Sequence, residues 1–156
     1  MNGRRTANSE RRTALTMMVA VGLLGSCGGE PEPIAVERLE VRIAPIAAVS
    51  ASGYFILRNR GSVADTLDAV ASAVADSVTP HESMDEGGGR TMMMPLSWIA
   101  IPAGDSVVFA PGGRHLMLER FTRPITPGDS VPLSFHFRSG RVLKLVAPVR
   151  AIAGQE

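Results

Sequence analysis

Two features of the sequence predict an all-β domain, folded as an antiparallel sandwich or barrel. Short apolar runs of strand length recur along most of the chain, separated by Gly, Pro, Asn and Asp. One of them places Val131, Leu133, Phe135 and Phe137 at every second position, which is typical of a strand with one buried face. At 156 residues the chain has room for one domain whose core is large enough to fold without crosslinks.

The predicted strands follow one another at short intervals. In chain order they are Gly53–Asn59, Ser97–Ile101, Val107–Ala110, His115–Leu118, Val131–Phe137 and about Val142–Val146. Turn sequences end or introduce them, including Asn-Arg-Gly after the first and Pro-Gly-Gly before the fourth. Trp98 is expected to pack in the core or at its rim, and His136 to lie on the surface. The polar, glycine-rich segment Glu82–Arg90 predicts a loop.

The segment Asp65–Val78 does not fit this pattern. It is rich in alanine, and Leu67, Val70, Ala71 and Val74 recur at helical spacing. Propensity alone predicts a helix here, whereas the family resemblance given below favours strands.

The amino terminus predicts an exported lipoprotein. Four arginines precede a short apolar stretch, Ala14–Leu24, which is too short to span a bilayer and is typical of a signal peptide. Small residues then lead to Cys27, an arrangement that resembles a bacterial lipobox. Residues 1–26 are therefore interpreted as the signal peptide, and Cys27 as the lipid-modified first residue of the mature protein. Gly28 after it favours sorting to an outer membrane.

The mature chain is divided into three parts. Residues 27–35, rich in Gly, Pro and Glu, predict a flexible tether. Residues 36–150 form the predicted domain, and residues 151–156 a tail. Removing residues 1–26 takes away four of 16 basic and one of 15 acidic residues, which leaves 12 and 14 and a net charge of −2.

Composition argues against several classes of function. No basic stripe with interleaved aromatic residues is present, so a nucleic-acid partner is not expected. No nucleophile motif such as G-x-S-x-G and no telling carboxylate pair points to an enzyme. Because Cys27 is the only cysteine, the cysteine ligand that blue-copper electron transfer requires is also missing from the predicted domain.

Methionine and histidine are concentrated in one window. Five of the eight methionines fall between residues 81 and 117, and two of the three histidines lie at or near its ends: His81, Met84, Met92, Met93, Met94, His115 and Met117. Thioether sulfur and imidazole nitrogen are neutral ligands that suit Cu(I), and methionine is not lost to disulfide formation in an oxidising compartment. The window therefore predicts a copper site.

Strand geometry indicates which of these side chains can lie on the same face. Side chains two apart on a strand share a face, so His115 and Met117 can reach one ion together. On a strand, Met92 and Met94 would share one face and Met93 would take the other, but periodicity does not identify the ligand face. Packing in the core is expected for Met92 and Met94, and Met84 is either a loop residue or a helper ligand.

The full spacing resembles that of a known family. His81-Glu82 is followed after ten residues by Met93, and after another twenty-one by His115-Leu116-Met117. This is similar to the periplasmic copper chaperones called PCuAC, whose signature is a His, a Met about a dozen residues later and a distant His-x-Met. The resemblance spans roughly residues 36–149 and includes these flanking segments: Gly53-Tyr54-Phe55, Arg58-Asn59, Pro80-His81-Glu82, Ile101-Pro102-Ala103-Gly104, Pro111-Gly112-Gly113 and Gly128-Asp129.

The resemblance implies a cupredoxin-like antiparallel β-sandwich with Greek-key connections and a site for one Cu(I) ion. The implied ligands are His81, Met93, His115 and Met117. Two departures from the family pattern matter. Glu82 stands where many members have a second methionine, with Met84 further on, and the stretch to Pro95 is one residue longer than is common. Met84 and Met92 are therefore kept as alternative ligands.

The implied function is that of a monomeric, extracytoplasmic metallochaperone rather than an enzyme. Its expected recipient is the CuA centre of a haem–copper oxidase or an assembly factor for that centre. One alternative is a periplasmic protein for copper buffering or resistance. Another is a β-sandwich interaction module whose metal site has lapsed.

Overall fold

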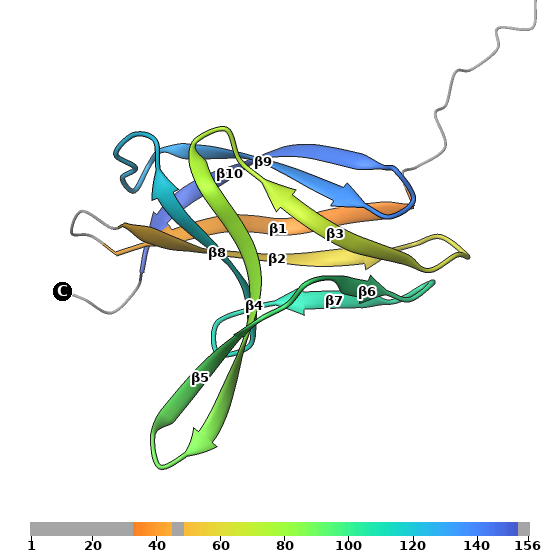
Figure 1. Ribbon diagram of the computed structural model, residues 1–156. Coiled ribbons are helices and arrows are strands. Elements are labelled where there is room, and N and C mark those ends of the chain that lie inside the picture. The colour runs from red at the N-terminus through yellow and green to blue at the C-terminus, as the bar shows by residue number, and fades with distance from the viewer. Residues whose placement is uncertain (1–32, 45–48, 153–156) are drawn as a thin grey trace, which may run out of the picture. The chain divides into compact units, whose positions relative to one another are not determined.

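A computed structural model describes residues 33–44 and 49–152, and all regular secondary structure within these ranges is β-strand (Figure 1). The strands are β1 Ile34–Ile43, β2 Ser50–Asn59, β3 Asp65–Ala71, β4 Ala75–Gly87, β5 Arg90–Pro95, β6 Ile99–Ile101, β7 Ser106–Phe109, β8 Arg114–Phe121, β9 Ser130–Phe137 and β10 Val142–Ala151. The described part of the chain contains no helix long and apolar enough to cross a membrane.

The strands form one continuous hydrogen-bonded sheet, which folds back on itself so that its apolar side chains lie in the interior. Their order is β5-β4-β8-β2-β1-β10-β9-β3-β6, and β7 pairs with β2. Phe55 on β2 stacks on Phe109 of β7 at 4.2 Å between ring centroids, and meets Phe135 of β9 edge-on at 5.2 Å. Because β2 and β9 are not neighbours in the path, the contact between Phe55 and Phe135 joins two layers across the core. The predicted β-sandwich is confirmed.

One strand pair departs from the antiparallel pattern. β1 and β10 run parallel, with Val41 opposite Val149. Short turns dictate antiparallel pairing only between strands that follow one another directly. β1 and β10 are the first and last strands of the described chain, so no short turn sets their relative direction.

Alternating burial confirms the strongest strand predictions. On β9, Val131, Leu133, Phe135 and Phe137 are buried, whereas His136 is exposed, as expected. β6 begins only at Ile99, and Trp98 before it is 56% exposed, so the expected packing of Trp98 in the core or at its rim is wrong.

A β-bulge explains the helix-like spacing of Asp65–Val78. The structure has strands here, β3 and the start of β4, and the propensity-based helix is wrong. The register of β3 against β9 shifts between Leu67 and Ala69, so one extra residue is accommodated. Leu67 and Val70 therefore both reach the core although they are three apart, and this spacing mimics a helical face.

The predicted loop Glu82–Arg90 is instead part of a β-hairpin. β4 continues to Gly87, and β5 returns from Arg90. Gly87, Gly88 and Gly89 have φ values of 83°, 64° and 77°, which glycine adopts without steric cost. The hairpin extends away from the layered strands (Figure 1).

Met92 and Met94 are exposed, so the expectation that they pack in the core is wrong. Every residue of β5 is exposed. β5 ends the strand path and pairs only with β4, on a hairpin that leaves the sandwich, so neither of its faces is covered.

The predicted boundaries of the domain shift slightly. Ile34 is 2% exposed at the start of β1, so the last two residues of the expected tether belong to the first strand. At the other end, Ala151 completes β10. The predicted signal peptide, Cys27 and the first part of the tether lie outside the described residues, as does the tail from residue 153.

Candidate metal centre

The two faces of β8 carry different chemistry. Leu116 and Leu118 are fully buried in the core. His115 and Met117 alternate with them and therefore lie on the opposite face. On β2, Gly53 faces Leu116, and a Cβ atom at that glycine would lie only 3.1 Å from the Leu116 Cβ. The core side of β8 is therefore closely packed, which fixes the orientation of the other face.

β4 places His81 directly beside His115. The two residues are cross-strand partners, and their ring centroids are 5.9 Å apart with the planes inclined by 20°. His115 is only 7% exposed, and His81 is partly buried. Two imidazoles that are 34 positions apart in the sequence are thus brought together by strand pairing.

Backbone carbonyl groups orient both imidazole rings. Nδ1 of His81 lies 3.1 Å from the carbonyl oxygen of Thr79, and Nδ1 of His115 lies 3.1 Å from that of Gly113. A carbonyl oxygen can only accept a hydrogen bond, so each Nδ1 carries the proton. In the neutral rings, Nε2 then keeps the lone pair that binds a metal ion.

The register of the hairpin places Met93 on the same face as the histidines. On β4, Ser83 is two residues after His81, and Met93 of β5 is directly opposite Ser83. Met117 is directly opposite Thr79, two residues before His81. Because directly opposed side chains of an antiparallel pair share a face, β4, β5 and β8 present His81, Met93, His115 and Met117 on one surface.

The two alternative ligands lie on the other face. Met84 and Met92 are cross-strand partners, and they form the pair next to that of Ser83 and Met93 along the hairpin. The side-chain alternation of strands therefore directs both away from the histidine face. Geometry favours Met93 over Met92, the choice that the sequence left open.

A metal ion on this face would depend on the thioethers. No three His, Cys, Asp or Glu side chains of the described residues are grouped closely enough to hold a metal ion. Glu82, the nearest acidic residue in the sequence, alternates to the other face, where it forms an ion pair with Arg114 at 3.2 Å.

The contribution of the backbone was not predicted from the sequence. The carbonyl groups of Thr79 and Gly113 set the imidazole orientation, and the Gly113 carbonyl also accepts a hydrogen bond from the Ser83 amide at 3.1 Å. Any residue type supplies a carbonyl group, so no residue identity signals this role.

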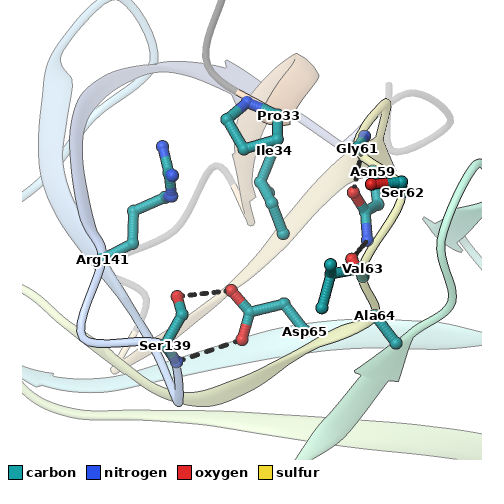
Figure 2. Close-up of a pocket in the computed structure, with 10 residues that line it drawn as sticks. All are labelled: Pro33, Ile34, Asn59, Gly61, Ser62, Val63, Ala64, Asp65, Ser139 and Arg141. Atoms are coloured by element: carbon teal, nitrogen blue, oxygen red, sulfur yellow. Dashed lines mark hydrogen bonds between the residues drawn. The ribbon is translucent and has the colours of Figure 1, made fainter.

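A separate pocket of about 310 Å³ lies near the start of β1 and the end of β2 (Figure 2). The Asn59 amide donates hydrogen bonds to the carbonyls of Val63 and Ile101. Asp65 accepts hydrogen bonds from the hydroxyl and amide of Ser139. Burial alone would raise the pKa of Asp65, but these bonds and one from the Thr66 amide outweigh it and lower the pKa. These polar groups hold loops together, so the pocket is interpreted as structural.

Comparisons with known proteins agree with this architecture. Residues 34–149 match the family model described as putative lipoprotein LpqE-like. Putative lipoprotein Lxx21020 of Leifsonia xyli subsp. xyli is 28% identical over 127 residues, which cover 81% of this chain and 75% of that protein.

Solved structures with the same fold are PCuAC domains and a related copper-bound protein. The copper-bound PCuAC domain from PmoF2 is 22% identical with a TM-score of 0.63, over 78% of this chain and 95% of that one. CuI-DR1885 from Deinococcus radiodurans is 26% identical with a TM-score of 0.62, over 80% and 83% of the two chains. The resemblance to PCuAC proteins is confirmed, and the chain belongs to the LpqE-like family of putative lipoproteins.

Proposed function

We propose that this protein carries one Cu(I) ion bound by His81, Met93, His115 and Met117. The observation that carries the proposal is their placement on one face of β4, β5 and β8, with both Nδ1 atoms held by backbone carbonyls. Two imidazoles and two thioethers form a neutral ligand set that matches Cu(I). The copper-bound PCuAC domain from PmoF2 and the Cu(I) form of DR1885 support a copper ion at this site.

The exposure of the site suits a carrier rather than a catalyst. Met93 is 55% exposed on the projecting hairpin, whereas His115 is 7% exposed on the sandwich. An incoming ligand can therefore displace the Met93 sulfur while His115 still holds the ion. Release then proceeds by ligand exchange, in which cysteine thiolates of a recipient replace thioethers one at a time.

The proposed recipient is the CuA centre of a haem–copper oxidase, or an assembly factor for that centre. The resemblance to PCuAC chaperones supports this choice. Copper buffering or resistance, without a dedicated recipient, is the second candidate, and the exposed Met93 that permits delivery would also permit exchange with a pool of copper.

Lipid attachment at Cys27 would place the carrier on the outside of a membrane. The lipobox-like sequence and the family description as lipoproteins support this proposal. Gly28 favours the outer membrane, which stays a prediction. A Cys27→Ser variant is expected to incorporate no radiolabelled palmitate, whereas the unchanged chain incorporates it. Equal labelling of the two would contradict attachment at this cysteine.

Competition with a Cu(I)-specific chelator tests the proposed site. The purified protein is expected to withdraw Cu(I) from bicinchoninate under anaerobic conditions. A His115→Ala/Met117→Ala variant is expected to bind Cu(I) at this site more than roughly 100-fold more weakly. Removing only a hydrogen-bonding partner of a metal ligand typically costs roughly 10- to 100-fold in affinity, and this variant removes two ligands. A His136→Ala variant removes an exposed histidine of β9 and serves as the matched control. Undiminished binding by the double variant would contradict the proposal.

A further inference from the structure

Three exposed methionines occupy the face of the hairpin opposite to the proposed Cu(I) site. Met84 on β4 and Met92 on β5 are directly opposed, and Met94 follows Met92 by two residues on the same face. Their exposed fractions are 51%, 45% and 47%. A methionine in a protein core usually fills gaps, but these side chains contact water, so core packing does not explain them.

The hairpin register brings the three sulfur atoms within reach of one another. Directly opposed residues of an antiparallel pair have Cβ atoms about 4.5–5.5 Å apart, and diagonal neighbours about 7–8 Å. These distances apply to Met84 with Met92 and to Met84 with Met94, respectively. The methionine side chain is long and unbranched, with three rotatable bonds, so three thioethers can converge on one point above the strands.

We propose that Met84, Met92 and Met94 form a second Cu(I) site, separate from the first. Three thioethers offer a soft, uncharged ligand set that selects Cu(I) over hard divalent ions such as Mg²⁺ and Ca²⁺. Glu82, which is opposite Met94, forms an ion pair with Arg114 at the border of this face, so its carboxylate is not counted among the ligands.

The second site uses a different face of the hairpin from the first site. The two sets of ligands lie on opposite faces of the same two strands and share no residue. Gly88 and Gly89 join these strands directly, and Met84 pairs with Met92 just before the register shift between Asp85 and Gly87. A second ion on the projecting hairpin would give the protein a capacity of two Cu(I) per chain.

NMR of methionine methyl groups tests the second site directly. In protein labelled with ¹³C at the methionine methyls, two equivalents of Cu(I) are expected to shift the Met84, Met92 and Met94 signals together. These shifts should persist in the His115→Ala/Met117→Ala variant, because they depend on the other face. Signals of the three methionines that stay at their metal-free positions would overturn the proposal and leave the first site unaffected.

A leucine variant separates metal binding from an apolar docking surface. Met84→Leu/Met92→Leu/Met94→Leu removes three sulfur atoms but keeps side chains of similar volume and apolar character. Because all three residues are exposed, the fold is expected to persist. The variant should bind one Cu(I) fewer than the unchanged protein by chelator competition. An unchanged stoichiometry would show that these three methionines bind no Cu(I), and would refute the site.

Discussion

Replacing Met93 with leucine is expected to weaken Cu(I) binding at the histidine site by at least about tenfold, about 1.4 kcal/mol. Met93 shares the face of His81, and leucine keeps its volume but removes the sulfur. The same change at Met92 is expected to alter the affinity of this site by less than about twofold, or roughly 0.4 kcal/mol. Chelator competition with each variant measures both effects.

The comparison of Met93 with Met92 is a sharp test because the two residues are adjacent and similarly exposed, at 55% and 45%. They differ mainly in the face of β5 that they occupy. To isolate the histidine site, both changes are best made together with Met84→Leu and Met94→Leu. A larger loss from Met92→Leu than from Met93→Leu would mean that the hairpin register in solution differs from the one described.

Truncating Leu116 to alanine is expected to lower the free energy of unfolding by about 2–5 kcal/mol, as is typical for a buried leucine. The side chain of Leu116, on β8, is fully buried in the core. Its neighbour Met117 faces the other way, so Met117→Leu is expected to cost less than about 1.5 kcal/mol of stability. Denaturant titration of both variants without metal measures these differences.

Copper binding should respond in the opposite order. Leu116→Ala removes no ligand and is expected to leave the Cu(I) affinity of the folded protein nearly unchanged, whereas Met117→Leu removes a sulfur and should weaken it at least about tenfold. If Leu116→Ala weakened binding as strongly as Met117→Leu, the division of β8 into a packing face and a ligand face would be wrong.

Much of the sandwich could be predicted because strand alternation is a local signal. Phe135 and Phe137 alternate with polar residues on β9, and burial follows the same pattern. At Leu67 and Val70 the signal failed for a specific reason: a bulge moved residues three apart to the same face, which a helix would also do. A bulge leaves no mark in local sequence that separates these two structures.

The hairpin was mispredicted because burial depends on neighbours distant in sequence. The glycines and charged residues of Glu82–Arg90 predict a loop, but most of this segment belongs to β4, which pairs with β5. An apolar side chain such as Met92 reads as a core residue unless it is known that its strand leaves the sandwich. No local sequence pattern indicates where a sheet ends.

The sequence proposed the members of the candidate site, whereas their arrangement could not be predicted from it. The spacing of His81 and His115 with Met117 pointed to these residues through a family resemblance. The choice between Met92 and Met93 depended on which residue of β5 is opposite Ser83, which only strand pairing decides. The carbonyl groups of Thr79 and Gly113 that orient the rings could not be identified from residue type.

Copper K-edge X-ray absorption most directly tests the claim that two histidines and two methionines bind one Cu(I) ion. The Met84→Leu/Met92→Leu/Met94→Leu variant, given one equivalent of Cu(I), restricts the signal to the histidine face. We predict a spectrum fitted by two imidazole nitrogens and two sulfurs around a single copper ion. A copper ion without imidazole nitrogen, or with no sulfur, would contradict the assignment of His81, Met93, His115 and Met117.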